Sequence, residues 1–96
     1  MRKLTPTPFP EHTTIDSAEG IGKLVRAVRT AAGMTLEETA LAVRVAKQTL
    51  QNLENGTGTV SLALAFKVLT GLGIRLRWQT PAAAITAPGK GVSNAS

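Results

Sequence analysis

The fold of this chain is decided by residues 35–56, which read TLEETALAVRVAKQTLQNLENG. The apolar residues of this stretch recur at the spacing of two short helices joined by a tight turn near Arg44, not at the spacing of one continuous helix. The first predicted helix covers residues 36–43 and the second covers residues 47–55. Two helices that meet through such a turn are the core of the predicted fold.

The second predicted helix has an apolar side and a polar side. With Leu50 and Leu53 turned inward, the outward residues are Lys47, Gln48, Gln51 and Asn52. A cation and three amides make a poor surface for packing against another protein core. The same groups are well suited to base edges and phosphates.

Length and charge favour a small domain with a polyanionic partner. The chain has 96 residues, which predicts one domain with a modest core and makes a homodimer a reasonable expectation. Its 11 Lys and Arg against 6 Asp and Glu give a formal net charge of +5. Such an excess attracts nucleic acid first and an anionic membrane surface second.

Several classes of function are disfavoured by composition. There is no cysteine, and His12 is the lone histidine, so thiolate chemistry is excluded and neither a metal site nor a catalytic constellation is predicted. We therefore expect no enzyme, no cofactor and no metal. Only Phe9, Phe66 and Trp78 are aromatic, and because two of these are predicted to be buried or strand-bound, no stacking platform for RNA is expected.

The chain also lacks the signals of membrane insertion or export. No apolar run approaches the roughly 20 residues of a spanning helix. The N-terminal sequence MRKLTPTPFP has no apolar core of a signal peptide. We expect a soluble protein of the cytoplasm.

Residues 1–16 are predicted to form an extended N-terminal arm. Pro6, Pro8 and Pro10 alternate there and oppose regular helix. The first interpretation is a disordered leader, because chain ends are usually mobile unless they are tied down. An arm that lies in a DNA groove is the alternative.

A first helix is predicted to begin after Asp16 or Ser17, either of which can cap it, and to end at Gly33. Its apolar stripe comprises Ile21, Leu24, Val25, Val28 and Ala32. Three cations, Lys23, Arg26 and Arg29, lie off this stripe. We interpret them as a solvated face, with phosphate contact by Lys23 or Arg29 as the sharper alternative.

A last helix is predicted to begin at the cap Ser61. Its predicted apolar side comprises Leu62, Ala65, Phe66, Leu69 and Leu72. With this helix, residues 17–73 are predicted to form a compact, all-α domain of four helices.

The pattern then changes to a two-residue repeat over residues 74–79. Ile74, Leu76 and Trp78 alternate with polar residues, which is typical of a half-buried strand. A single strand needs a partner, so we expect it to pair across a dimer axis or with the N-terminal arm. A short tail that packs Trp78 on its own core is the simpler alternative. Residues 80–96 are rich in small residues, Pro and Gly, and are predicted to be disordered.

These residues carry a resemblance to a known family. Residues 17–73 resemble the lambda-repressor-like (Xre-type) helix-turn-helix family. The most specific part is ALAVRVAKQTLQNLENG, which is similar to the family's pattern L-A-x-x-x-G-V-S-x-x-x-I-S-x-x-E-x-G. The alternating segment IRLRWQ that follows narrows the resemblance toward HipB-type antitoxins, in which a strand at that place forms a two-chain sheet.

The resemblance implies roles for individual residues. Contacts to DNA bases are implied for Lys47, Gln48, Thr49 and Asn52. Contacts to DNA phosphates are implied for Lys23, Thr35 and Gln51. Dimerisation is implied for Ile74, Leu76 and Trp78. Glu54 and Asn55 match the end of the family's motif, where the role is structural.

The function implied by the resemblance is a dimeric transcription regulator that binds an operator in double-stranded DNA. The narrower expectation is an antitoxin that represses its own operon and neutralises a HipA-like serine/threonine kinase toxin. Two alternatives stay open, namely a stand-alone phage-type repressor and an inhibitory protein-protein module with weak DNA binding.

Three residues depart from the family's pattern. Arg44 stands in place of the turn glycine, and a positive φ there costs a non-glycine residue roughly 1 kcal/mol. Ala46 stands in place of the small polar cap, a loss of typically ~1 kcal/mol. Leu36 stands in place of a glutamine that often contacts phosphate. None of them forbids the fold, and together they leave open a domain that keeps the architecture but binds DNA weakly and serves mainly as a protein-protein module.

Overall fold

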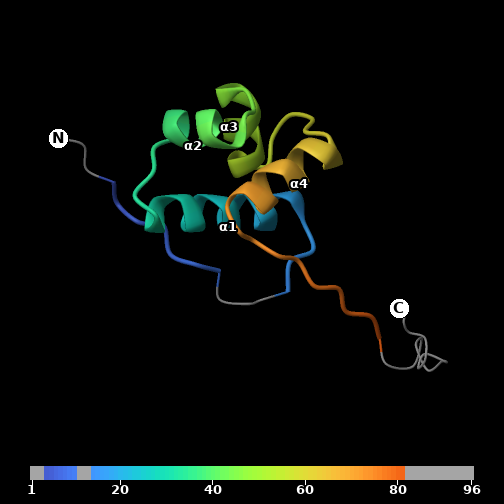
Figure 1. Cartoon of the computed structure of the whole chain (residues 1–96). Coiled ribbons are helices and arrows are strands. Elements are labelled where there is room, and N and C mark those ends of the chain that lie inside the picture. Colours follow the sequence, from blue (N-terminus) through green and yellow to red (C-terminus); the bar gives the residue numbers. More distant parts are fainter. Residues whose placement is uncertain (1–3, 11–13, 82–96) are drawn as a thin grey trace.

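The computed structural model describes residues 4–10 and 14–81. The described part of the chain contains four helices, which are α1 (Ala18–Ala31), α2 (Leu36–Val43), α3 (Lys47–Asn55) and α4 (Leu62–Gly71). Figure 1 shows α2 and α3 on one side of α1, with α4 beside them. The predicted four-helix domain is confirmed, and α2 and α3 have the predicted bounds.

Side-chain caps fix the beginnings of three helices. The Ser17 hydroxyl accepts a hydrogen bond from the Gly20 N–H at 3.0 Å, so Ser17 and not Asp16 caps α1. Thr35 and Glu38 form a complete capping box at the start of α2. The Ser61 hydroxyl accepts from the Leu64 N–H at 3.1 Å at the start of α4. These caps satisfy backbone N–H groups that have no partner within a helix.

The turn between α2 and α3 has the left-handed backbone geometry that is unfavourable for a non-glycine residue such as Arg44. Arg44 has φ 62° and ψ 51°, and it is the one non-glycine residue with positive φ in the described part of the chain. Lys67 of α4 donates from Nζ to the Arg44 carbonyl at 3.0 Å, which ties the turn to the last helix. Ala46, the residue before α3, gives no side-chain cap.

Replacing Ala46 with serine is expected to stabilise the protein by about 1 kcal/mol, because the new hydroxyl can accept an orphan N–H in the first turn of α3. Urea unfolding followed by circular dichroism measures this change. The matched control is Ala42→Ser, an exposed residue inside α2, where serine is expected to be neutral or slightly destabilising. Equal effects at both positions would contradict the capping argument.

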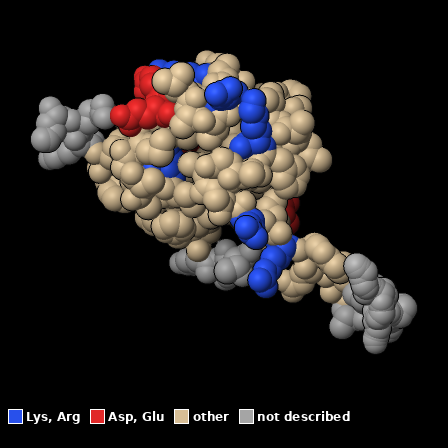
Figure 2. Space-filling view, viewed as in Figure 1, with Lys and Arg blue, Asp and Glu red and all other residues tan. Residues whose placement is uncertain are grey.

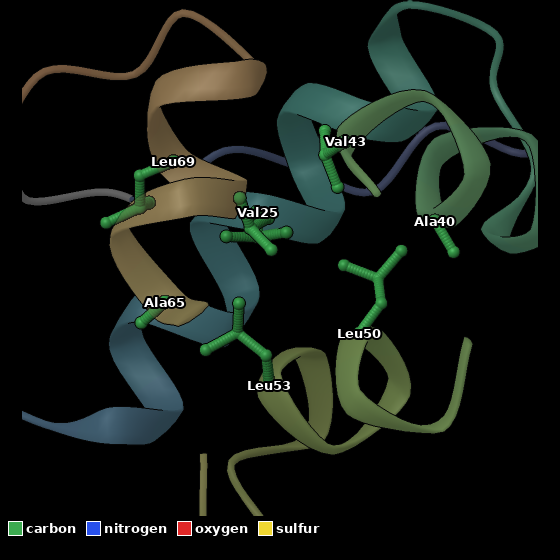
Figure 3. Packing of buried hydrophobic residues seen from close by; sticks show 8 residues of the cluster. Val25, Ala40, Val43, Leu50, Leu53, Ala65 and Leu69 are labelled. Atoms are coloured by element: carbon green, nitrogen blue, oxygen red, sulfur yellow. The ribbon is translucent and has the colours of Figure 1, made fainter. Parts of the chain in front are cut away.

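The core lies where the four helices meet. Figure 3 shows Val25 of α1 facing side chains from the other three helices. The buried apolar cluster comprises Val25, Ala40, Val43, Leu50, Leu53, Ala65, Val68 and Leu69. The inward positions predicted for α2 and α3 are confirmed, since Ala40, Leu50 and Leu53 all belong to this cluster.

The predicted apolar side of α4 is partly wrong. Ala65 and Leu69 are buried as expected, but Leu62 is 72% exposed and Phe66 is 46% exposed. Val68, which the prediction left out, is fully buried. The first turns of α4 are apolar almost all round, so the periodicity of the sequence does not identify the buried face.

Helices α1 and α3 approach each other closely at Gly22. A Cβ atom added at Gly22 would lie 2.3 Å from the Leu53 carbonyl oxygen and 2.5 Å from the Glu54 carbonyl oxygen. The missing side chain therefore lets the end of α3 rest against the backbone of α1. Because Leu53 and Glu54 belong to α3, Gly22 helps to fix where that helix lies.

The N-terminal arm contacts α1 over the residues that the structure describes. The Thr7 N–H donates to the Thr30 hydroxyl at 2.9 Å, and Figure 1 shows the arm running along α1. Thr30 in turn donates to the Arg26 carbonyl at 2.9 Å. The disordered leader predicted here therefore has an anchor at Thr7, while residues 1–3 and 11–13 lie outside the described ranges.

Residues 74–79 form no strand within this single chain. They are extended, and among the described residues no backbone hydrogen bond joins them to the arm. Trp78 is 82% exposed, so the alternative that packs it on its own core is wrong. Pairing across a dimer stays a prediction. The disorder predicted for residues 80–96 falls, from residue 82 onward, outside the described part of the chain.

Candidate nucleic-acid interface

The polar face of α3 is the candidate interface. Leu50 and Leu53 hold the helix against the core, and Lys47, Gln48 and Gln51 are exposed on the other side. Thr49 and Asn52 are half-buried at the edges of this face. The structure thus brings the four predicted base-contact residues onto one short helix, and their contact with DNA stays a prediction.

Two of the predicted base-contact residues are bonded to each other. Gln48 Nε2 donates to Asn52 Oδ1 at 3.0 Å, one helical turn along α3. The backbone of Gly58 lies close to the Asn52 amide, because a Cβ added at Gly58 would lie 2.9 Å from Asn52 Nδ2. Such a bond holds both amides in one orientation, and each amide keeps further donors and acceptors for a base edge.

Lys47, at the start of α3, has a partner on α2. Its Nζ donates to Glu37 Oε2 at 2.8 Å, and the two side chains are 52% and 66% exposed. The ion pair lies at the surface, where such pairs contribute little to stability. The pair joins the beginning of the polar face of α3 to the first turn of α2.

A buried ion pair sets the end of α3 against α1. Arg29 Nε lies 2.6 Å from Glu54 Oε2, and Arg29 Nη2 donates to Glu54 Oε1 at 2.9 Å. Arg29 is 7% exposed and Glu54 is 5% exposed. The same arginine donates from Nη1 to the Met34 carbonyl at 2.8 Å, so it joins α1, the following loop and α3.

The interpretation of Arg29 as a solvated or phosphate-contacting cation is therefore wrong. Its guanidinium donates hydrogen bonds to the Glu54 carboxylate and to the Met34 carbonyl inside the protein. Arg26 is the outer member of this cluster, with Nε 3.2 Å from Glu54 Oε1 and Nη2 donating to Asn55 Oδ1 at 2.9 Å. The structural role expected of Glu54 and Asn55 matches these contacts.

The three predicted phosphate contacts come from three helices or their caps. Lys23 is exposed on α1, and Gln51 is exposed on α3. Thr35 caps α2, where its hydroxyl accepts from the Glu38 N–H at 3.1 Å and keeps its own hydrogen for a donor bond. Side chains from three helices can position a nucleic-acid backbone from several directions. Their contact with phosphate stays a prediction.

Basic side chains are spread over the face seen in Figure 2. They lie on the helical body and on the segment that leaves it, and most of the acidic side chains in view gather at the upper left. No group of three or more His, Cys, Asp or Glu suited to a metal ion occurs among the residues that the structure covers. None of the described helices is long and apolar enough to cross a bilayer.

The predicted dimerisation residues differ in exposure. Ile74 packs against the core, whereas Leu76 and Trp78 are exposed in the single chain. Residues 75–79, residues 14–16 and two residues of α1, Ile21 and Leu24, line a hollow of about 840 Å³. The expectation that Phe66 is buried is wrong, and the three aromatic residues Phe9, Phe66 and Trp78 lie on the arm, α4 and the last segment.

Two ion pairs, Arg29 with Glu54 and Lys47 with Glu37, were not predicted from the sequence. Arg29 follows Gly22 and Val25 at seven and four residues, which places it on the buried side of α1, and this spacing was a usable signal. The contact of Glu37 with Lys47 joins residues ten apart in different helices, so no local pattern shows it.

Comparisons with known proteins place this geometry in context. A sequence model described as helix-turn-helix matches residues 25–79. No curated protein sequence matches the chain. Similar solved structures include "HipB-O4 20mer complex" and "Structure of HipA-HipB-O2-O3 complex", each with 25% identity, a TM-score of 0.63, and coverage of 70% of this chain and 94% of that chain.

Two further structures are similar over a shorter part of the chain. The restriction-modification controller protein C.AhdI from Aeromonas hydrophila has 29% identity and a TM-score of 0.55, with coverage of 60% of this chain and 88% of that chain. The clp gene regulator ClgR from C. glutamicum has 38% identity and a TM-score of 0.53, with coverage of 59% of this chain and 73% of that chain.

Proposed function

We propose that this chain, which belongs to the lambda-repressor-like (Xre-type) helix-turn-helix family, binds a specific operator in double-stranded DNA and regulates transcription from it. The chain has the fold of a DNA-binding regulator and resembles HipB and other regulators in structure. The observation that carries the proposal is the polar face of α3, which the buried Leu50 and Leu53 turn outward. A helix of this kind fits the major groove.

The proposed base contacts follow from the chemistry of each side chain. Gln48 and Asn52 can bond an adenine through paired donor and acceptor groups, and Lys47 can reach O6 and N7 of guanine. Thr49 can contact a thymine methyl group. Lys23, Thr35 and Gln51 would then hold phosphates and set the position of α3 in the groove.

The proposed assembly is a homodimer joined through residues 74–79. Ile74, Leu76 and Trp78 would form a strand with the same segment of a second chain, which covers the exposed Leu76 and Trp78. A two-fold dimer of this fold reads two half-sites about 34–36 Å apart on the duplex. Light scattering of the purified chain checks the assembly.

The narrower proposal is an antitoxin of a HipBA-like toxin-antitoxin pair. It is supported by the similarity to HipB, whose structures include the "HipA-HipB-O2-O3 complex". The chain would repress its own operon in the cytoplasm and bind and neutralise a HipA-like serine/threonine kinase toxin. Its role would be that of a regulator and not of an enzyme.

A second candidate is an inhibitory module whose main partner is a protein. Arg44 adopts the left-handed conformation, and Ala46 gives the start of α3 no side-chain cap. Both features would make α3 a weaker DNA-binding helix. Leu62 and Phe66 leave apolar area exposed on α4, which suits a protein partner. A stand-alone phage-type repressor is a third possibility within the same fold.

A DNA titration at two salt concentrations separates these functions. Purified protein is titrated against the promoter upstream of its own gene and against random duplex of equal length, at low and at physiological salt. An operator-binding repressor retains the promoter complex at physiological salt, whereas nonspecific binding weakens steeply because counterions are released. If both duplexes dissociate together, the operator proposal is wrong and the protein-partner candidate takes its place.

Alanine at Gln48 or Asn52 is expected to weaken promoter binding by ~1–3 kcal/mol, or about 5- to 150-fold, with little change on random duplex. Alanine at Lys23 is expected to weaken binding on both duplexes alike and to reduce the salt slope by about 1. Fluorescence anisotropy of labelled duplexes measures all three variants. Equal losses on both duplexes for Gln48→Ala and Asn52→Ala would refute their assignment as base readers.

A further inference from the structure

The amine of Lys47 is already bonded before any DNA arrives. Glu37 lies in the first turn of α2, and its Oε2 accepts from Lys47 Nζ at 2.8 Å. The neighbouring Glu38 is bonded differently, since its Oε1 accepts from the Thr35 N–H at 2.9 Å in the capping box. Glu37 is thus bonded to the recognition helix through Lys47.

We propose that Glu37 is a specificity-determining residue, which holds Lys47 for a base edge and disfavours its transfer to phosphates. This inference rests on the proposed operator binding. A lysine amine has three N–H donors, so one can stay with Glu37 while two remain for O6 and N7 of a guanine. The ion pair thereby fixes a flexible side chain in one place.

The alternative use of Lys47 is nonspecific. A lysine without a partner can swing to the nearest phosphate on any sequence, because its stem is flexible and its charge is compact. Each such contact releases counterions and raises affinity for all DNA. A carboxylate on Lys47 competes with this contact, since the amine must leave one anion to reach the other.

The position of Glu37 adds a second effect of the same sign. In a helix-turn-helix the first helix crosses the DNA backbone, and α2 is that helix here. The Glu37 side chain is 66% exposed, so its charge would face phosphates across solvent. This repulsion weakens operator and random complexes alike, so it lowers affinity without changing the preference between them, and the preference depends on the hold on Lys47.

The experiment compares Glu37→Gln with Glu38→Gln on promoter and random duplex. Both variants remove one negative charge from the first turn of α2, and glutamine at residue 38 can still complete the capping box. For Glu37→Gln we expect tighter binding to random duplex, with its salt slope steeper by about one phosphate contact. The preference for the promoter over random duplex should fall, and this fall should shrink by about 3-fold from 50 to 200 mM salt, since the contribution of one freed phosphate contact changes by that factor.

The control and the double variant decide whether the effect passes through Lys47. Glu38→Gln should tighten both duplexes about equally and leave the preference unchanged. In a Lys47→Ala background, Glu37→Gln should no longer change the preference. Equal effects of the two single variants, or a change that persists without Lys47, would show a general charge effect and overturn the inference.

The failure of this inference is distinguishable from that of the proposed function. A wild-type protein that prefers its promoter, with an unchanged preference in Glu37→Gln, retains operator binding and refutes the role of Glu37 alone. A wild-type protein with no preference for its promoter refutes operator binding and this inference together. Circular dichroism of each variant checks that folding is intact, as expected for an exposed ion pair.

Discussion

Replacing Glu54 with alanine is expected to destabilise the protein by about 3–5 kcal/mol, because the substitution leaves the buried Arg29 charge without its partner. Arg29 is 7% exposed and makes two of its hydrogen bonds to this one carboxylate. Native domains are stable by only about 5–15 kcal/mol, so this loss is a large fraction of the stability of a small domain. Urea or thermal unfolding followed by circular dichroism measures the loss.

Two controls test the cause. Arg26→Ala removes the outer, partly exposed arginine of the same cluster and should cost less than Glu54→Ala, since Arg26 reaches solvent. The double variant Arg29→Leu with Glu54→Leu replaces both charges with apolar groups and should recover most of the loss. A double variant as unstable as Glu54→Ala alone would mean that packing, and not an orphaned charge, explains the result.

Replacing Gly22 with alanine is expected to cost about 3 kcal/mol, at the upper end for overpacking a well-filled site. The new methyl group would meet the carbonyl oxygens of Leu53 and Glu54 at 2.3 and 2.5 Å, and backbone atoms cannot rotate aside as a side chain can. Helices α1 and α3 would have to separate. The same unfolding measurement applies.

Gly20→Ala is the matched control, two residues earlier in the same helix. Its new methyl group would meet the Ile15 side chain at 3.0 Å, which can move, and the substitution also favours helix by up to ~1 kcal/mol. We expect a small change of either sign. If Gly22→Ala were as mild as Gly20→Ala, the close approach of the two backbones would not be fixed by Gly22.

Both substitutions act on the interface through the position of α3. Glu54 and the Gly22 contact hold the end of that helix, while its beginning carries Lys47 and Gln48. A variant that stays folded with a shifted α3 should therefore lose promoter binding while retaining its helical signal. This outcome is distinct from loss of a base contact, which leaves stability unchanged.

The sequence was sufficient to predict the four helices and the direction in which the polar face of α3 points. Helices α2 and α3 have strong local signals, since Thr35 and Glu38 cap one and the glycine after Asn55 ends the other. These signals act within a few residues of each other. For the same reason Leu50 and Leu53 were placed inward correctly.

The failures come from contacts between distant residues. Leu62 and Phe66 were expected inside because α4 is apolar on most sides, and only the packing of the other helices selects its buried face. The role of Gly22 becomes visible only when α3 lies against it, because its contacts are with the distant residues Leu53 and Glu54. Arg29 was assigned to solvent because a charged residue is usually exposed unless a partner such as Glu54 is known.

The exposure of Trp78 gives the protein an intrinsic optical reporter. Trp78 is the sole tryptophan, the chain has no tyrosine, and the indole is 82% exposed in the single chain. Its fluorescence therefore responds to burial of residues 74–79 and carries no signal from a tryptophan in the helical core. A blue shift of the emission as protein concentration rises would report the association of two chains, independently of the helical content that circular dichroism records.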